Sequence, residues 1–261
     1  MTSTETSHDP TIAAELSAHQ VLVITLDRPA LTTKFLTDTA RAVEDAAQSP
    51  GIRLIVLAGR GAIFCVGADL HSDSAEDPAQ ATILLESLNR LVSALRHAPQ
   101  LVVAAVNGPA VGGGLSLVLA ADLVIANTSA YLKAGFTEIG LLPDGGLSAT
   151  LTHLIGPQRA LAMTVLNTTV DAELAHRLGI YAQIWPPEIF HDRVSALIGD
   201  LAAGPTHAYS ATKRAIHRAA AELDTALAEE RREQSKLLQH RDFSDSVRAF
   251  RAKHAASVNV E

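Results

Sequence analysis

The stretch that decides the fold is Leu101-Val-Val-Ala-Ala-Val-Asn107-Gly-Pro-Ala-Val-Gly112-Gly113-Gly114, an apolar run that ends in a cluster of glycines. Its first seven residues are almost continuously apolar, which is typical of a strand buried on both faces of a sheet. The glycines permit a tight turn, and we expect a helix to follow from Gly113 to Ala120. The order of strand, glycine turn and helix predicts a mixed α/β core.

A second glycine-rich loop stands in the same relation to an earlier strand. The strand expected at residues 52–58 leads into Gly59-Arg-Gly-Ala-Ile-Phe-Cys-Val-Gly67-Ala68-Asp69-Leu70. A phosphate loop of the Walker type would end in Gly-Lys-Ser/Thr, and that lysine is absent. The glycines of the first stretch do not have dinucleotide-binding spacing. Both loops instead offer backbone N–H groups, the one before the expected helix at a terminus that favours an anion.

The remaining pattern predicts a strand-and-helix core followed by an all-helical, more charged end. We expect further strands at residues 20–27, 122–126 and 180–184, and helices at residues 36–48, 78–97, 151–166, 171–177, 188–201, 207–240 and 244–254. The composition changes near residue 200. We therefore predict a disordered tail at residues 1–10, a core at 11–200 that carries the site, and a helical region at 201–261.

Composition and charge exclude several function classes. The 261 residues are 48% hydrophobic and carry a formal net charge of -7. The sequence shows no clustered basic face, so we do not expect nucleic acid as a partner. Cys65 is the single cysteine, so neither an intrachain disulfide nor a cysteine metal cluster is possible. The eleven histidines include no His-Glu-x-x-His, so no metal is expected.

The same sequence gives no reason to expect a membrane partner. Residues 1–10 lack the apolar core of a secretory signal. The long apolar run from Leu101 to Ala126 is interrupted by Pro109 and several glycines, so a strand, a turn and a buried helix explain it better than a membrane span. We expect a cytoplasmic protein.

Two segments closely resemble the signature segments of the crotonase (enoyl-CoA hydratase/isomerase) superfamily, namely Phe64-Cys-Val-Gly-Ala-Asp-Leu70 and Ala105-Val-Asn-Gly-Pro-Ala-Val-Gly-Gly-Gly114. The resemblance continues through residues 26–29, 120–126, 140–146 and 155–160, so it covers nearly the whole chain. It implies an α/β crotonase fold, a spiral of ββα turns in two sheets. It also implies a helical C-terminal region that mediates oligomerisation, so we expect a homotrimer or a dimer of trimers.

The resemblance also implies a substrate, an acyl-CoA thioester, and no cofactor, because CoA is part of that substrate. The N–H groups of Ala68 and Gly113 would form an oxyanion hole for the thioester oxygen, and losing one such donor typically costs roughly 3–4 kcal/mol. Lys253 matches a basic residue that can reach the CoA phosphates, although it can also be a solvated helix charge. The other residues expected at the substrate are Val66, Gly67, Asp69, Leu70, Gly112 and Phe136.

Hydratases of this family carry two glutamates that manage water and a proton. At the matching positions this chain has Ser116, which we expect to be a small wall residue, and Phe136. Glu138 lies two residues too far along for the second position. Its alternative role is an exposed or ion-paired carboxylate on a strand edge.

Asp144 is the better candidate for an acid/base. The string from Gly135 to Gly146 resembles enoyl-CoA delta-isomerases and ring-epoxide phenylacetyl-CoA isomerases, and one carboxylate suffices for that chemistry. An apolar pocket supplied by Phe136, Leu141 and Leu142 would raise the pKa of Asp144. The alternative is that Asp144 caps the helix that starts near residue 146.

Three hypotheses follow from these residues. The leading one is an isomerase of an unsaturated or strained-ring acyl-CoA, with Asp144 as acid/base. The second is an enoyl-CoA hydratase that uses Asp144 or Glu138, and the third is a non-catalytic acyl-CoA-binding subunit. The acyl group and the pathway stay open, because fatty-acid, aromatic-acid and sterol degradation all use this fold.

Overall fold

The computed structural model describes residues 13–16, 20–27, 29–69 and 78–219. The chain divides into two compact units, Met1–Ala202 and Ala203–Glu261. The second unit contains α8 (Thr206–Ala219). The tail at residues 1–10, Leu70, Lys253 and the helix expected at 244–254 lie outside the described residues. The role of the second unit in oligomerisation stays a prediction.

The main sheet of the first unit has six strands in the order β1-β2-β3-β4-β6-β9. All neighbouring strands are parallel except β1 and β2. Parallel neighbours need crossover connections, and helices supply most of them. The strands are β1 (Ala13–Leu16), β2 (Val21–Leu26), β3 (Leu54–Gly59), β4 (Leu101–Val106), β6 (Leu123–Asn127) and β9 (Gln183–Trp185).

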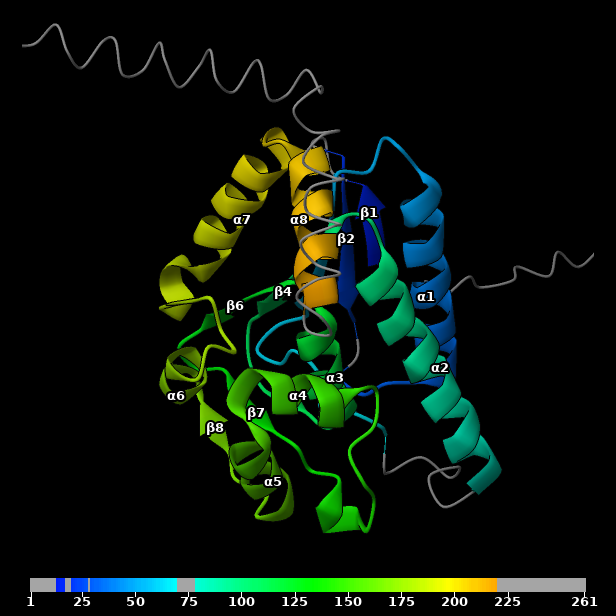
Figure 1. Ribbon diagram of the computed structural model, residues 1–261, viewed down its shortest axis with the longest axis vertical. Helices are drawn as coiled ribbons and strands as arrows, with labels where there is room; N and C mark the ends of the chain where they lie inside the picture. The colour runs from blue at the N-terminus through cyan, green and yellow to red at the C-terminus, as the bar shows by residue number, and fades with distance from the viewer. Residues whose placement is uncertain (1–12, 17–19, 28, 70–77, 220–261) are drawn as a thin grey trace, which may run out of the picture. The chain divides into compact units, whose positions relative to one another are not determined.

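Helices cover both faces of this sheet because its strands are apolar on both sides. On β4, Val102, Ala104 and Val106 join the larger core, whereas Val103 and Ala105 join the smaller one. The larger core includes α1 (Thr33–Gln48), α2 (Pro78–His97) and α3 (Gly113–Ala120), and α1 and α2 lie side by side in Figure 1. The smaller one includes α7 (Pro187–Ala203). The expected doubly buried strand is thus confirmed.

A second, three-stranded sheet has the order β5-β7-β8. Its strands are β5 (Ala110–Val111), β7 (Tyr131–Lys133) and β8 (Val170–Asp171). The sequence analysis missed them because two or three residues are too short to show an alternating pattern. An isolated parallel bridge between Cys65 and Ala110 joins the glycine-rich loop at residues 59–70 to β5. The predicted α/β class is confirmed.

Among the described residues, the helices agree with the prediction except in one place, and the helix expected at 207–240 is described only as far as Ala219. α2 and α3 have the expected bounds, and α6 (Ala172–Arg177) is capped by the Asp171 side chain. The single helix expected at 151–166 is instead two helices, α4 (Leu147–Ile155) and α5 (Pro157–Val165). Gly156, with φ of 81°, and Pro157, which has no N–H to donate, end the first and start the second.

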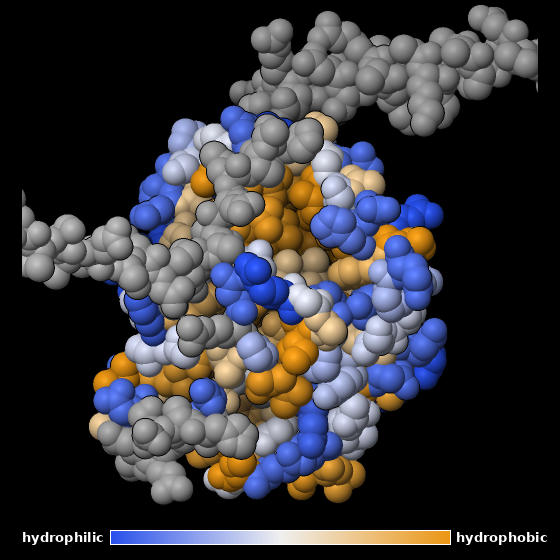
Figure 2. Space-filling model, turned by 180° about the vertical axis from the view of Figure 1, so that it is seen from behind, coloured by the Kyte–Doolittle hydropathy of each residue, from blue (hydrophilic) through white to orange (hydrophobic). Residues whose placement is uncertain are grey.

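Hydrophobic residues also reach the surface, in patches between hydrophilic ones on the face shown in Figure 2. Ile139, Leu141 and Leu142 are among the exposed large side chains. They belong to or follow the short 3-10 helix η1 (Thr137–Ile139). Among the described helices, none is long and apolar enough to cross a membrane. The described His, Cys, Asp and Glu side chains form no group of three suited to a metal ion.

Candidate active site

The two glycine loops are held together by backbone hydrogen bonds. The N–H of Val111 donates to the carbonyl of Cys65 at 2.8 Å, and the N–H of Leu31 donates to the carbonyl of Gly67 at 2.7 Å. The N–H of Gly112 donates to the carbonyl of Lys133 at 3.1 Å, which joins the loop at residues 107–114 to β7. Residues 65–68 and 110–113 therefore form one continuous piece of backbone structure.

Glycine is required where these loops touch. A Cβ on Gly114 would lie 2.3 Å from the carbonyl oxygen of Cys65, closer than any real side chain. Gly67 has φ of 84°, and a Cβ there would lie 3.0 Å from the carbonyl oxygen of Val111 and 3.3 Å from the nitrogen of Gly113. The sequence pattern of glycines thus reflects a close approach of two backbones.

This approach brings the two expected oxyanion donors into neighbouring positions. Gly113 is the first residue of α3, where an N–H has no acceptor within the helix. Within the described part of the chain, no backbone acceptor is recorded for the N–H of Gly113 or of Ala68 outside helices and strands. The geometry fits an oxyanion hole, and the role itself stays a prediction.

Asp144 presents a carboxylate that no neighbouring group neutralises. Its residue is about half-buried, and its Oδ1 atom is fully buried without a hydrogen-bond partner. Burial raises the pKa of Asp144 to about 6, because a carboxylate loses hydration there. A carboxyl with this pKa can accept and return protons near neutral pH.

The alternative role of Asp144 as a helix cap is wrong. The cap of α4 is Gly146, with φ of 74° and no side-chain hydrogen bond. Asp144 contributes its backbone carbonyl instead, which accepts from the N–H of Leu147 at 3.0 Å and from the hydroxyl of Ser116 at 2.9 Å. Its side chain is therefore free of a structural duty in this turn.

The wall expected from Leu141 and Leu142 is also wrong, because these side chains are 54% and 76% exposed. Phe136 is buried as expected. The side chains that contact the turn come from α2 and α3 instead. Leu88 Cδ2 lies 3.2 Å from the Cβ position of Gly145 and 3.4 Å from that of Gly113. Leu88 thus lies against both the turn at Gly113, called the oxyanion turn below, and the turn at residues 143–146, called the carboxylate turn.

The chain matches the family model described as "Enoyl-CoA hydratase/isomerase" over residues 17–259. It belongs to this family.

Known relatives show how varied members of the enoyl-CoA hydratase/isomerase family are. A protein of Rhodobacter capsulatus described as a "probable enoyl-CoA hydratase" is 39% identical, with 93% of this chain and 95% of that protein covered. The 1,2-epoxyphenylacetyl-CoA isomerase of Escherichia coli is 34% identical, with 90% and 93% covered. The enoyl-CoA hydratase structure from Bacillus anthracis has a TM-score of 0.87 at 26% identity, with 93% and 96% covered.

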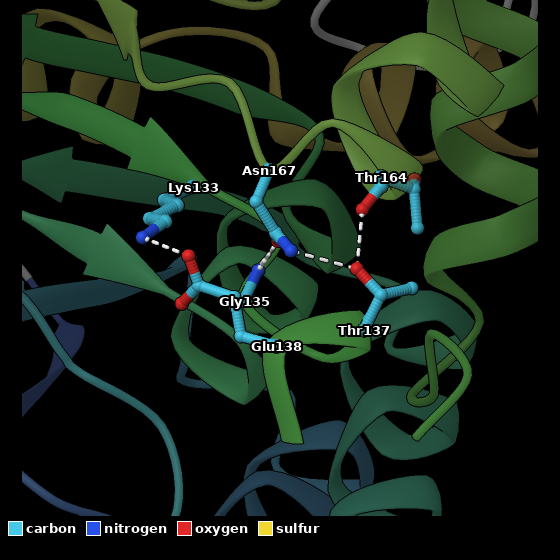
Figure 3. Close-up of polar contacts among 6 residues, drawn as sticks. All are labelled: Lys133, Gly135, Thr137, Glu138, Thr164 and Asn167. Carbon is cyan, nitrogen blue, oxygen red and sulfur yellow. Dashed lines mark hydrogen bonds and ion pairs between the residues drawn. The ribbon is translucent and has the colours of Figure 1, made fainter. Parts of the chain in front are cut away.

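Glu138 has the ion-paired role in this family member. Its Oε1 accepts from Lys133 Nζ at 2.6 Å, and its side chain is 50% exposed (Figure 3). It lies in η1 and not on a strand edge as expected. This carboxylate is therefore held in an ion pair at the surface.

A polar network fixes the η1 segment in place (Figure 3). Asn167 accepts from the N–H of Gly135 at 2.9 Å and donates to the hydroxyl of Thr137 at 2.7 Å. That hydroxyl donates in turn to the carbonyl of Thr164 at 2.8 Å. The bonds join η1 to the end of α5, so Glu138 has a surface position set by structure.

The other expected site residues lie around the same loops. Val66 and Asp69 are exposed beside the oxyanion turn, and Gly112 is the cap of α3. Cys65 is buried, and burial raises the pKa of its thiol to about 12, so it stays protonated. Sequence reasoning missed Leu88 and Val92, although their spacing of four residues on α2 places them on one helix face.

Proposed function

We propose that the chain is an acyl-CoA isomerase in which Asp144 carries a proton between two carbons of the acyl group. The observation that supports this proposal is the carboxyl itself, with a buried and unpartnered Oδ1 and a pKa raised to about 6 by burial. At neutral pH this group is mostly ionised yet still a competent acid once protonated. The substrate class is an unsaturated or strained-ring acyl-CoA thioester.

In the proposed reaction of a 3-enoyl-CoA, Asp144 takes the proton from the carbon next to the thioester. The electron pair of that C–H bond passes into the thioester, and the negative oxygen is held by the N–H groups of Ala68 and Gly113. The neutral carboxyl then gives the proton to the carbon two positions further along. The double bond has moved, and no atom has been gained or lost.

A hydratase is the second candidate, because the relative from Rhodobacter capsulatus is described as a probable enoyl-CoA hydratase. Hydration requires one group that activates a water molecule and another that delivers the proton to the α-carbon. At the two positions of the family's glutamates this chain has Ser116, a buried hydroxyl, and Phe136, a buried ring. Glu138 is paired with Lys133. Among the described residues, Asp144 is the carboxyl that supports an acid/base role, and a single acid/base favours isomerisation over hydration.

The test is incubation in D2O with 3-hexenoyl-CoA and 2-hexenoyl-CoA, with products followed by mass. We expect double-bond migration with deuterium uptake, and Asp144→Asn should lower kcat by about 10²- to 10⁴-fold. Glu138→Gln is the matched control and should retain activity.

Other outcomes are equally clear. Full turnover by Asp144→Asn would contradict the proposal, and a product heavier by one water would establish the hydratase. Binding of CoA esters without any turnover would support the non-catalytic subunit.

A further inference from the structure

Ser116 lies on the same helix as the expected oxyanion donor. It follows Gly113 by three residues in α3, which places both on one helix face. Its side chain is 1% exposed. The hydroxyl lies 2.9 Å from the carbonyl oxygen of Asp144 and 3.5 Å from that of Gly112, so the bond to Asp144 is the better one.

The carboxylate turn is packed directly onto Ser116. Gly145 has φ of 58°, and a Cβ on it would lie 2.8 Å from Ser116 Cβ. On the α2 side, Leu88 contacts the Gly145 position, and Val92 Cγ1 lies 4.0 Å from the Cβ position of Gly146. These contacts are apolar and have no preferred orientation.

The Ser116 hydroxyl supplies the directional contact that they lack. Among the described residues, its bond to Asp144 is the one recorded hydrogen bond that reaches residues 143–146 from outside the turn and α4. The side chains that touch the turn from α2 and α3 are uncharged. Within the described ranges, no ion pair is recorded at residues 143–146 that would substitute for this hydrogen bond.

We propose that Ser116 is a positioning residue, which fixes the Asp144 carboxyl relative to the N–H of Gly113 by holding the Asp144 carbonyl. This inference rests on the proposed function of Asp144. One rigid helix then sets both halves of the site, because Gly113 begins α3 and Ser116 lies one turn later. The position that carries a glutamate in family hydratases serves here as a support for the carboxylate.

A nucleophilic role for Ser116 does not fit the same contacts. A serine nucleophile needs an adjacent base that accepts its proton. Here the hydroxyl donates to a backbone carbonyl, which is no base, and the side chain is buried against Gly145. The hydroxyl is therefore a donor in the structure and not a reactant.

The experiment compares Ser116→Ala with Ser116→Cys, which keeps the volume but donates only weakly. Both should lower kcat for 3-hexenoyl-CoA by about 10- to 100-fold, because a small misplacement of a catalytic group is costly, while KM stays within about twofold. The control is Ser129→Ala, at an exposed serine in the β6–β7 turn. Thermal unfolding checks that each variant is folded.

A substrate-free measurement accompanies the kinetics, namely ¹³C NMR titration of aspartate-labelled protein with the Asp144 signal assigned by Asp144→Asn. Loosening the turn should hydrate the carboxyl and move its pKa from about 6 toward the ordinary value near 3.8. This readout decides the positioning role even if the reaction assigned to Asp144 is wrong.

Two results would overturn the inference. One is wild-type kcat and an unshifted Asp144 titration in both variants. The other is a wild-type Ser116→Cys beside a defective Ser116→Ala, which would show that volume and not the hydrogen bond matters. Full turnover by Asp144→Asn would instead sink the proposed function alone.

Discussion

The two sides of the site are built in different ways. The oxyanion side, residues 65–68 with 110–114, is made of backbone and is fixed by hydrogen bonds and a strand bridge between two loops. The carboxylate side, residues 143–146, is a turn with two glycines at positive φ and the side chain of Asp144, for which we propose the acid/base role. Among the described residues, it is seated by apolar contacts and by the Ser116 hydroxyl.

The difference explains why the family shares a fold but not one reaction. A backbone N–H is present whichever residue other than proline occupies the position, so the proposed oxyanion hole does not depend on the identity of a side chain. A side chain on a turn can be exchanged or moved without loss of the fold. We therefore expect the carboxylate side to select the reaction, and the burial of Asp144 to set the pKa of the proposed acid/base.

The largest effect is expected from Gly114→Ala, which disrupts the packing of the two loops on the oxyanion side. The new Cβ would lie 2.3 Å from the Cys65 carbonyl oxygen and 2.8 Å from Cys65 Cβ. The loops must separate, at a cost of about 3 kcal/mol or more in the free energy of unfolding. Urea unfolding measures it. Gly199→Ala in α7 is the control, since nothing lies within 4 Å of its Cβ position and it should stabilise by up to about 1 kcal/mol. Equal stability of both variants would refute the close approach.

The next effect concerns the protonation of Asp144. Because the base must be ionised, kcat should fall as the pH is lowered through about 6, and by about 100-fold two pH units below it. A pH profile of kcat for 3-hexenoyl-CoA measures this. A profile that stays flat down to about pH 4 would show that the desolvated carboxyl is not the base.

The same contrast decides what sequence could predict. The glycines at 67 and 112–114 predict the two backbone turns of the oxyanion side, because a close backbone approach or a positive φ requires glycine. Continuous apolar runs likewise predict strands of the main sheet, and the glycine turn before residue 113 predicts the start of α3. These features are local, or repeat along the chain, so they are visible without coordinates.

The carboxylate side was less visible because it depends on contacts between distant segments. The sequence suggested Asp144, but it placed the exposed Leu141 and Leu142 in its pocket and missed Leu88 on α2, more than fifty residues earlier. The short strands β5, β7 and β8 were missed for a related reason. Each exists because a partner strand is nearby, and not because its own residues demand it.

A smaller effect is expected on stability in Asp144→Asn. The folded pKa of Asp144, about 6, lies above the ordinary 3.8, so the native state binds this proton more tightly than the unfolded state does. The ionised group therefore destabilises the fold above about pH 6, and this cost disappears as the pH falls toward 4. The neutral variant should be more stable by about 1–2 kcal/mol at pH 8, less so near pH 5. Urea unfolding at both pH values tests it, and a destabilised variant at pH 8 would contradict it.

The smallest effect is expected from Glu138→Gln, which separates the surface carboxylate from the site. Its pair with Lys133 is half-exposed, and such pairs contribute about 0–1 kcal/mol. The polar network of Asn167 and Thr137 holds η1 without the Glu138 charge. We expect a change below about 0.5 kcal/mol in unfolding free energy and below about twofold in kcat, both smaller still in high salt. A loss of kcat comparable to that of Asp144→Asn would mean that the two carboxylates act together, as hydration requires, and the isomerase would have to be given up for the hydratase.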